Sequence, residues 1–253
     1  MLFQYFFIIL QRFNHKQRNM ITFDDKFARS EGLLGSEKMK RLRDARIVIF
    51  GIGGVGSWCA EGLVRTGACH VTLVDSDDVD STNINRQIEA TERSVGLSKV
   101  ETMKERLLSI NSQADIVAIH DRWDDGFVGR HAAFSFDDYD FVVDAIDSVN
   151  DKILLILEAT KSSSTLISSM GAARKTNPQD VRISEFWKVE GCPLARSLRN
   201  KMKQNKTFPS KKFDCVYSKE RPVPSSYESM KGSIVQVTAT FGFTLCSMIV
   251  NSI

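Results

Sequence analysis

The residues with the clearest chemical meaning form a glycine loop, Gly51-Ile-Gly-Gly-Val-Gly56, with the spacing G-x-G-x-x-G. An apolar run at 47–50 precedes the loop and an amphipathic helical pattern follows it, so the loop joins a buried strand to a helix. Gly51 permits the tight turn, Gly53 lets the backbone approach a phosphate, and Gly56 lets the helix pack on the strand. Since a helix N-terminus attracts anions, the loop predicts a nucleotide-phosphate site. A tight turn without a ligand is the alternative.

A carboxylate stands where a nucleotide-binding sheet would need one. Asp75 follows the apolar run 71–74, 19 residues after Gly56. A carboxylate at this position accepts hydrogen bonds from ribose hydroxyls. The same residue would serve ATP or NAD, so it does not decide between them, and an ordinary surface aspartate is the alternative interpretation.

Charged residues on the later loops separate the two nucleotides. Arg86 and Lys99 come after the ribose carboxylate. Asp144 and Asp147 stand at the end of the apolar run 141–143. Cations at this edge of a sheet can stabilise charge on a transferring phosphoryl group, and a carboxylate can hold Mg²⁺. Each residue alone could be a surface charge, but together they favour ATP over the NAD of a dehydrogenase.

Apolar runs alternate with helical patterns through the first two thirds of the chain. This alternation predicts a doubly wound α/β fold of the Rossmann type, with a mostly parallel sheet that binds ligands at one edge. The predicted strands are 47–50, 71–74, 116–119, 141–143 and 166–169. We assign 20–253 to one ATP-binding domain. Within it, 191–232 is a long insertion or crossover ahead of a C-terminal packing element at 233–253.

Charge is spread unevenly along an otherwise ordinary soluble composition of 42% hydrophobic and 26% charged residues. The net charge is +3, yet 191–232 holds ten Lys or Arg against three Asp or Glu. This segment therefore predicts a basic surface for a polyanion, and a solvated lysine-rich loop is the alternative. Its candidate phosphate contacts are Arg196, Arg199, Lys201, Lys203, Lys206, Lys211 and Lys212.

The cysteines and the chain ends indicate a cytoplasmic protein. None of the five cysteines forms a C-x-x-C pair, so there is no zinc signal, and free thiols suit a reducing compartment. The apolar residues 1–10 are too few to span a bilayer, so we treat 1–19 as an extension, with peripheral membrane contact through 1–10 as an alternative. Polar residues interrupt 233–253, and we expect no integral membrane segment there.

These motifs together resemble the ubiquitin-activating-enzyme-like superfamily that includes MoeB and ThiF. The matching segments are Ile49-Phe-Gly-Ile-Gly-Gly-Val-Gly-Ser57, Leu73-Val-Asp-Ser-Asp-Asp-Val79, Asn83-Ile-Asn-Arg-Gln87, Val95-Gly-Leu-Ser-Lys-Val100 and Asp144-Ala-Ile-Asp147. Within the superfamily the chain is most similar to the tRNA threonylcarbamoyladenosine dehydratases. Signals of that branch are Phe27-Ala-Arg-Ser-Glu-Gly-Leu-Leu-Gly35, Ser168-Ser-Met-Gly-Ala172, Cys192-Pro-Leu-Ala-Arg196, Asp214-Cys-Val-Tyr-Ser-Lys-Glu220 and Val237-Thr-Ala-Thr-Phe-Gly242.

The resemblance implies a role for each site residue. Gly53 and its neighbour Gly54 would cradle ATP, and Asp75 would hold the ribose. Asn83, Arg86 and Lys99 would contact phosphates, and Asp147 would bind Mg²⁺ or orient the reacting groups. Arg29 would reach across a homodimer to the partner's ATP. The full expected nucleotide site is Gly51, Gly53, Gly54, Gly56, Asp75, Asp77, Asn83, Arg86, Lys99, Asp144 and Asp147.

The resemblance also implies the reaction. ATP would activate the carboxylate of the threonyl group on adenosine 37 of tRNA as an acyl-adenylate, and attack by the ureido group would then close a ring and release AMP. A MoeB-like or ThiF-like adenylyltransferase acting on a sulfur-carrier or ubiquitin-like protein is the main alternative. An NAD-dependent oxidoreductase is a weaker one. The expected partners are tRNA, a second copy of the chain and a sulfur-transfer protein of a cysteine desulfurase system, with no DNA.

Two cysteines and one serine bear on the choice of branch. Some relatives use a catalytic cysteine, so Cys192 and Cys215 are candidates for a thioester or persulfide, with small packing residues as the alternative. Ring closure needs no thiol. The two zinc-binding C-x-x-C pairs common in MoeB-like proteins are missing from the sequence, and Ser148 follows Asp147 as is typical of the dehydratase branch.

Overall fold

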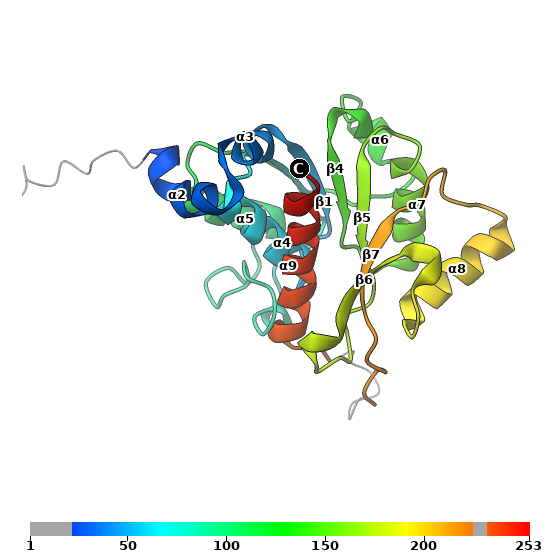
Figure 1. Ribbon diagram of the computed structural model, residues 1–253. Coiled ribbons are helices and arrows are strands. Elements are labelled where there is room, and N and C mark those ends of the chain that lie inside the picture. The colour runs from blue at the N-terminus through cyan, green and yellow to red at the C-terminus, as the bar shows by residue number, and fades with distance from the viewer. Residues whose placement is uncertain (1–21, 225–231) are drawn as a thin grey trace, which may run out of the picture.

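A computed structural model describes residues 22–224 and 232–253 and shows a layered α/β fold (Figure 1). In this part of the chain one sheet of seven strands has the order β3-β2-β1-β4-β5-β7-β6. β6 pairs antiparallel with β7, and the other neighbours pair in parallel. The strands are β1 (Arg46–Phe50), β2 (His70–Val74), β3 (Asp115–Ile119), β4 (Phe141–Asp144), β5 (Thr165–Ser169), β6 (Val181–Glu185) and β7 (Asp214–Ser218).

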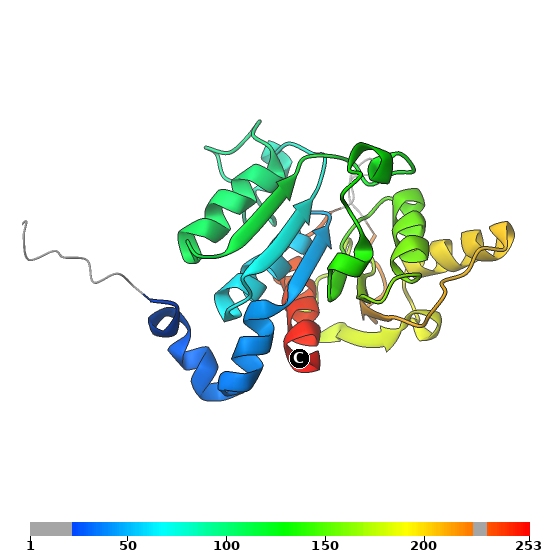
Figure 2. The ribbon, with the colours of Figure 1, turned by 90° about the horizontal axis from the view of Figure 1, so that it is seen from above.

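Helices cover both faces of the sheet (Figures 1 and 2). One face packs against α4 (Gly56–Thr66), α5 (Lys99–Ile110) and α9 (Val235–Ser252), and the other against α7 (Val149–Ala159) and α8 (Pro193–Asn205). The helices α2 (Phe23–Leu34) and α3 (Ser36–Asp44) precede β1, and α6 (Phe127–Arg130) follows β3. The short 3-10 turns are η1 (Ser81–Asn83), η2 (Phe136–Asp138), η3 (Pro178–Asp180) and η4 (Phe186–Lys188).

The inner strand β1 has a continuous apolar run because both of its faces are covered. Ile47 and Ile49 enter the core shared with α4, α5 and α9, whereas Val48 and Phe50 enter the core shared with α7 and α8. Since successive side chains of a strand point to opposite faces, a strand covered on both faces needs an unbroken apolar run. Each such side chain contributes roughly 1.5–3 kcal/mol by leaving water.

The C-terminal helix α9 is a core element. It has the length and apolarity of a membrane-crossing helix, but Phe241, Leu245 and Ile249 are fully buried against the sheet and α4. The expected packing role of 233–253 is therefore confirmed for the helix.

The parallel sheet and its five predicted strands are confirmed, each within about one residue at its ends. The segment 191–232 has more regular structure than expected. It contains the helix α8 and the strand β7, and β7 together with the antiparallel β6 extends the sheet. The predictions for residues 1–19 lie outside the described residues.

Candidate active site

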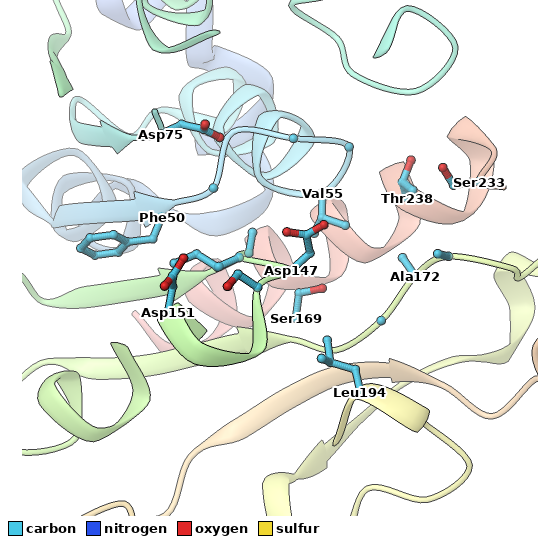
Figure 3. A pocket seen from close by; sticks show the side chains of 18 of the residues that line it. Phe50, Val55, Asp75, Asp147, Asp151, Ser169, Ala172, Leu194, Ser233 and Thr238 are labelled. Carbon is cyan, nitrogen blue, oxygen red and sulfur yellow. The ribbon is translucent and has the colours of Figure 1, made fainter. Parts of the chain in front are cut away.

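A cavity of about 1060 Å³ opens at the carboxyl ends of the parallel strands (Figure 3). Phe50 pairs with Val74 on one side and with Asp144 on the other, so the loops after β1, β2 and β4 emerge side by side. This is where the strand order reverses, and open α/β sheets bind ligands at such a point. In Figure 3, Asp147 lies between Asp75 and the opposite wall, where Ala172 and Leu194 are placed.

The glycine loop has the close contacts that its glycines predict. Gly51 adopts φ 88°, and a Cβ there would lie 2.8 Å from the backbone carbonyl of Ala145. A Cβ on Gly56 would lie 1.9 Å from the carbonyl oxygen of Gly51, so no side chain fits at either position. Gly53 and Gly54 line the cavity. The N-cap residue Val55 makes no side-chain cap, which leaves amide groups at the start of α4 available to an anion.

Asp75 connects the glycine loop to the second strand. One of its carboxylate oxygens accepts a hydrogen bond from the amide of Ile52 at 2.6 Å, and the other accepts from the amide of Asp77 at 2.9 Å. Burial raises the pKa of Asp75, and the nearby ammonium of Lys99 opposes this rise. Asp75 therefore fixes the shape of the loop, in addition to the ribose contact predicted for it.

The two predicted cations and Asn83 all line the cavity. Lys99 is 5% exposed, and its Nζ lies 2.8 Å from Oδ2 of Asp77. The Nη1 atom of Arg86 donates to the carbonyl oxygen of Thr82 at 2.7 Å. Asn83 is buried and accepts a hydrogen bond from the amide of Asp80, which fixes the turn that carries Arg86. The structure thus brings these residues to the glycine loop, as expected.

The paired aspartates after β4 have different positions. Asp147 lines the cavity, whereas Asp144 is fully buried beneath it. Asp144 lies 2.9 Å from the Nζ of Lys152 and accepts a hydrogen bond from Ser168 at 2.7 Å. The expected direct contact of Asp144 with the nucleotide is wrong, because Asp144 does not line the cavity and its carboxylate is paired with Lys152 beneath it. The pair holds the loop instead, since Lys152 also donates to the carbonyl of Ile146.

Arg29 does not join the cavity wall of its own chain. It lies on the exposed side of α2, and the cavity is built from other elements. Its predicted role concerns a second copy of the chain, so it stays a prediction.

The sequence did not point to half of the cavity wall as a site. The loop after β5 contributes Gly171–Lys175, and the first turns of α8 contribute Leu194 and Ser197. Arg174 adopts the left-handed conformation, with φ 57°, between backbone hydrogen bonds to Gly232 and Val223. The only signal was the pair of branch motifs at 168–172 and 192–196, which gave no role to single residues.

The two candidate cysteines are packing residues in this geometry. Cys192 is 2% exposed and Cys215 is 0% exposed. Burial raises the pKa of the Cys215 thiol well above its usual value, which disfavours the thiolate that a nucleophile needs.

Comparison with known proteins places this site in a family. The model of the ThiF family matches residues 27–253. The chain belongs to the ThiF family. A tRNA threonylcarbamoyladenosine dehydratase of Bacillus subtilis (strain 168) is 38% identical over 200 residues, which cover 78% of this ThiF-family chain and 76% of the relative.

A solved structure has the same fold as this chain and contains ATP, the nucleotide that the sequence predicts for the cavity. The crystal structure of the Escherichia coli tRNA N6-threonylcarbamoyladenosine dehydratase TcdA in complex with ATP gives a TM-score of 0.82 at 36% identity, covering 90% of this chain and 93% of that one. By contrast, the adenylyltransferase and sulfurtransferase of Aedes aegypti is 37% identical over 124 residues only, 49% of this chain and 27% of its own length. The similarity to dehydratases therefore extends over much more of the chain.

Proposed function

We propose that this ThiF-family protein is an ATP-dependent tRNA threonylcarbamoyladenosine dehydratase of the cytoplasm. The observation that carries the proposal is the cavity, which joins the glycine loop, Arg86, Lys99 and Asp147 at one strand edge. These groups suit the adenylation of a carboxylate, because they can hold ATP and neutralise charge on its phosphates. The alignment with the Bacillus subtilis dehydratase, which covers 78% of this chain, supports the same reaction.

In the first step, a carboxylate oxygen of the substrate attacks the α-phosphorus of ATP, and pyrophosphate leaves. The amides of Gly53 and Gly54 and the start of α4 hold the phosphates, while Asp75 accepts from the ribose. Lys99 and Arg86 neutralise charge that builds up on the phosphate oxygens. Lys99 is well placed for this because it is held at the cavity by Asp77, from which it can turn to a phosphate.

In the second step, the ureido group attacks the activated acyl carbon, loses a proton, and AMP leaves. The groups joined in this step belong to one substrate, so the protein's main contribution is to orient them and to exclude water. The cavity wall formed by Gly171–Lys175 and the first turns of α8 is the part that faces the nucleotide half of the cavity. We assign the modified nucleoside to this wall.

Mg²⁺ fits the carboxylates at this edge. Asp147 lines the cavity just before α7, and Asp151 lines it from the first turn of α7, where it is paired with Arg122 at 2.8 Å. No group of three or more His, Cys, Asp or Glu that could hold a metal occurs among residues 22–224 and 232–253. Mg²⁺ takes one or two carboxylates together with phosphates and water, and it would neutralise the charge of the triphosphate.

ATP–pyrophosphate exchange, followed by mass spectrometry of the tRNA nucleosides, tests the proposal. The wild-type protein should exchange label when tRNA bearing threonylcarbamoyladenosine is added, and it should convert that nucleoside to its cyclic form. Lys99→Ala should lower both rates by a factor on the order of 10² or more, while the exposed Lys161→Ala should leave them unchanged. Exchange that needs a small protein ending in Gly-Gly, and not tRNA, would favour the protein-adenylating alternative.

Two partners belong to the same proposal. A homodimer would place Arg29 of each chain at the ATP of the other. A sulfur-transfer protein of a cysteine desulfurase system would dock on this chain without a cysteine of the cavity, because Cys192 and Cys215 are buried.

A further inference from the structure

Two aromatic side chains stand exposed beside α8 and are anchored to the core. Trp187 is 36% exposed and Phe208 is 54% exposed, and their ring centroids are 6.1 Å apart. Trp187 also contacts the buried Phe186 at 5.2 Å, and Phe186 stacks on the buried Phe213 at 4.9 Å with an interplanar angle of 20°. The exposed pair is therefore the outer end of a row of rings that begins inside the protein, so its orientation is held by packing.

One face of α8 directs cations toward this pair. The Nη1 atom of Arg199 donates to the carbonyl oxygens of Phe186 and Trp187, each at 3.1 Å, so this face of the helix lies against η4. Lys203 follows Arg199 by four residues on the same face, and Lys206 follows as the C-cap just past the end of α8. Both are exposed. The stretch 191–213 contains seven cations and no Asp or Glu, so this stretch is uniformly basic, while Glu185 and Glu190 flank the turn η4 that carries Trp187.

The backbone of Lys206 provides a second, independent observation. Lys206 is the C-cap of α8 and adopts the left-handed conformation, with φ 54° and ψ 34°. Glycine is the usual residue at such a position, because a side chain costs conformational energy there. Retaining a lysine in this conformation is understandable if its charge is used, since strained residues gather at functional positions.

The same helix links this surface to the cavity. Leu194 and Ser197 in the first turns of α8 line the cavity, and Arg199, two residues later, contacts Trp187. The 13 residues of α8 rise about 20 Å and project away from the sheet beside β6 and β7 (Figure 1). A polymer that enters the cavity with one residue can therefore lay its next few residues along α8.

We propose that Trp187, Phe208, Lys203 and Lys206, the α8 end surface, bind unpaired nucleotides of an RNA loop whose modified base occupies the cavity. The rings stack on the faces of the neighbouring bases, and the lysines contact the phosphates. Bases offer their faces to aromatic side chains only where the strand is single, which excludes the paired stem of an RNA as the occupant. This inference rests on the proposed function, because it takes the substrate to be a tRNA loop.

Steady-state kinetics with tRNA bearing threonylcarbamoyladenosine tests the α8 end surface. Trp187→Ala combined with Phe208→Ala should raise the KM for tRNA by a factor on the order of 10², because each of the two base stacks contributes about a factor of 10. The kcat and the KM for ATP should change little. Trp187→Phe should retain most of the affinity, since a ring remains. Lys206→Gly should weaken tRNA binding and lower the slope of log Kd against log salt concentration by about one.

Lys206→Gly also separates a binding effect from misfolding. Glycine suits the left-handed conformation of this C-cap, so this variant should unfold at the same temperature as the wild type or higher while binding tRNA more weakly. Unchanged tRNA KM in the double aromatic variant would overturn the inference, and so would a change in sedimentation behaviour that marked the surface as a contact between copies of the chain. A wild-type protein that shows no tRNA-dependent turnover would instead refute the proposed function.

Discussion

At the scale of single residues, the residues that a nucleotide site requires could be predicted from the sequence, but whether each one is buried or lines the cavity could not. Glycine loops, a ribose carboxylate and cations near phosphates have fixed spacings along the chain, so Gly51, Asp75 and Lys99 were predicted and line one cavity. Asp144 was misassigned because sequence spacing cannot show that Lys152 comes back from the next helix to pair with it. A carboxylate that stands in the wall and one that lies beneath it look alike in sequence.

Glu89 is a residue whose environment makes stability depend on pH. It is 2% exposed near the glycine loop, and burial raises its pKa from 4.5 to about 7. Between these two values the folded protein keeps a proton that the unfolded chain has lost. The contribution of Glu89 to stability is therefore fully present below pH 4.5 and is lost as the pH rises through about 7, a change of roughly 3 kcal/mol.

Urea unfolding at pH 5.5 and pH 8 measures this effect. The wild type should lose stability between the two values, on the order of 2 kcal/mol from this residue alone. Glu89→Gln should flatten that dependence because it removes the titrating group, and the exposed Glu92→Gln should leave it as in the wild type. The same pH dependence in Glu89→Gln and in the wild type would contradict the assignment.

At the scale of elements, four of the five strands predicted from the sequence are buried on both faces, and the fifth, β3, is a partly exposed edge strand. β1 and β4 contain unbroken apolar runs because helices cover them on either side. β6 is an edge strand with the sequence VRISE, two of whose residues are exposed, and its apolar signal is correspondingly weak. α8 buries only Ala195, Leu198 and Met202, and its many basic residues conceal that narrow stripe. β6 and α8 form because of pairing and packing with distant segments, and their local sequence patterns alone do not predict them.

The contact of α4 with α9 shows how an element far along the chain sets the glycine loop. A Cβ on Gly242 of α9 would lie 2.5 Å from the carbonyl oxygen of Val55 and 2.7 Å from the Cβ of Trp58. Val55 belongs to the glycine loop, and these atoms are backbone or near-backbone atoms that cannot swing aside. Gly242→Ala should therefore push α9 away from the loop, cost about 1–3 kcal/mol of stability and weaken ATP binding.

Thermal unfolding and ATP titration check this prediction together. Gly32→Ala is the matched control, because a Cβ at this helical glycine of α2 would meet nothing within 4 Å. It should leave ATP binding unchanged and raise stability by up to about 1 kcal/mol. Unchanged ATP affinity in Gly242→Ala would show that α9 does not hold the loop.

At the scale of the whole molecule, the sheet order places the cavity where two halves of the fold meet. The half with β1, β2 and β3 carries the nucleotide groups, and the half with β5, β7 and α8 carries the wall assigned to the modified nucleoside. The first half could be predicted from motifs. The second could not, because β6, α8 and β7 are brought to the cavity by pairing with β5 and by packing on α7. Arg29 belongs to neither half, since it stands on the exposed side of α2.

Mixing two inactive variants tests the proposal that each chain of a homodimer places its Arg29 at the ATP of the other chain. Arg29→Ala supplies an intact Lys99, and Lys99→Ala supplies an intact Arg29. If each site takes Lys99 from its own chain and Arg29 from its partner, a mixed dimer has one complete site and one site without either group. Random mixing in equal amounts makes half of the dimers mixed, so the pool should regain about a quarter of wild-type activity after co-expression. If both groups act within one chain, the mixture will be no more active than the separate variants, and the partner role of Arg29 will be excluded.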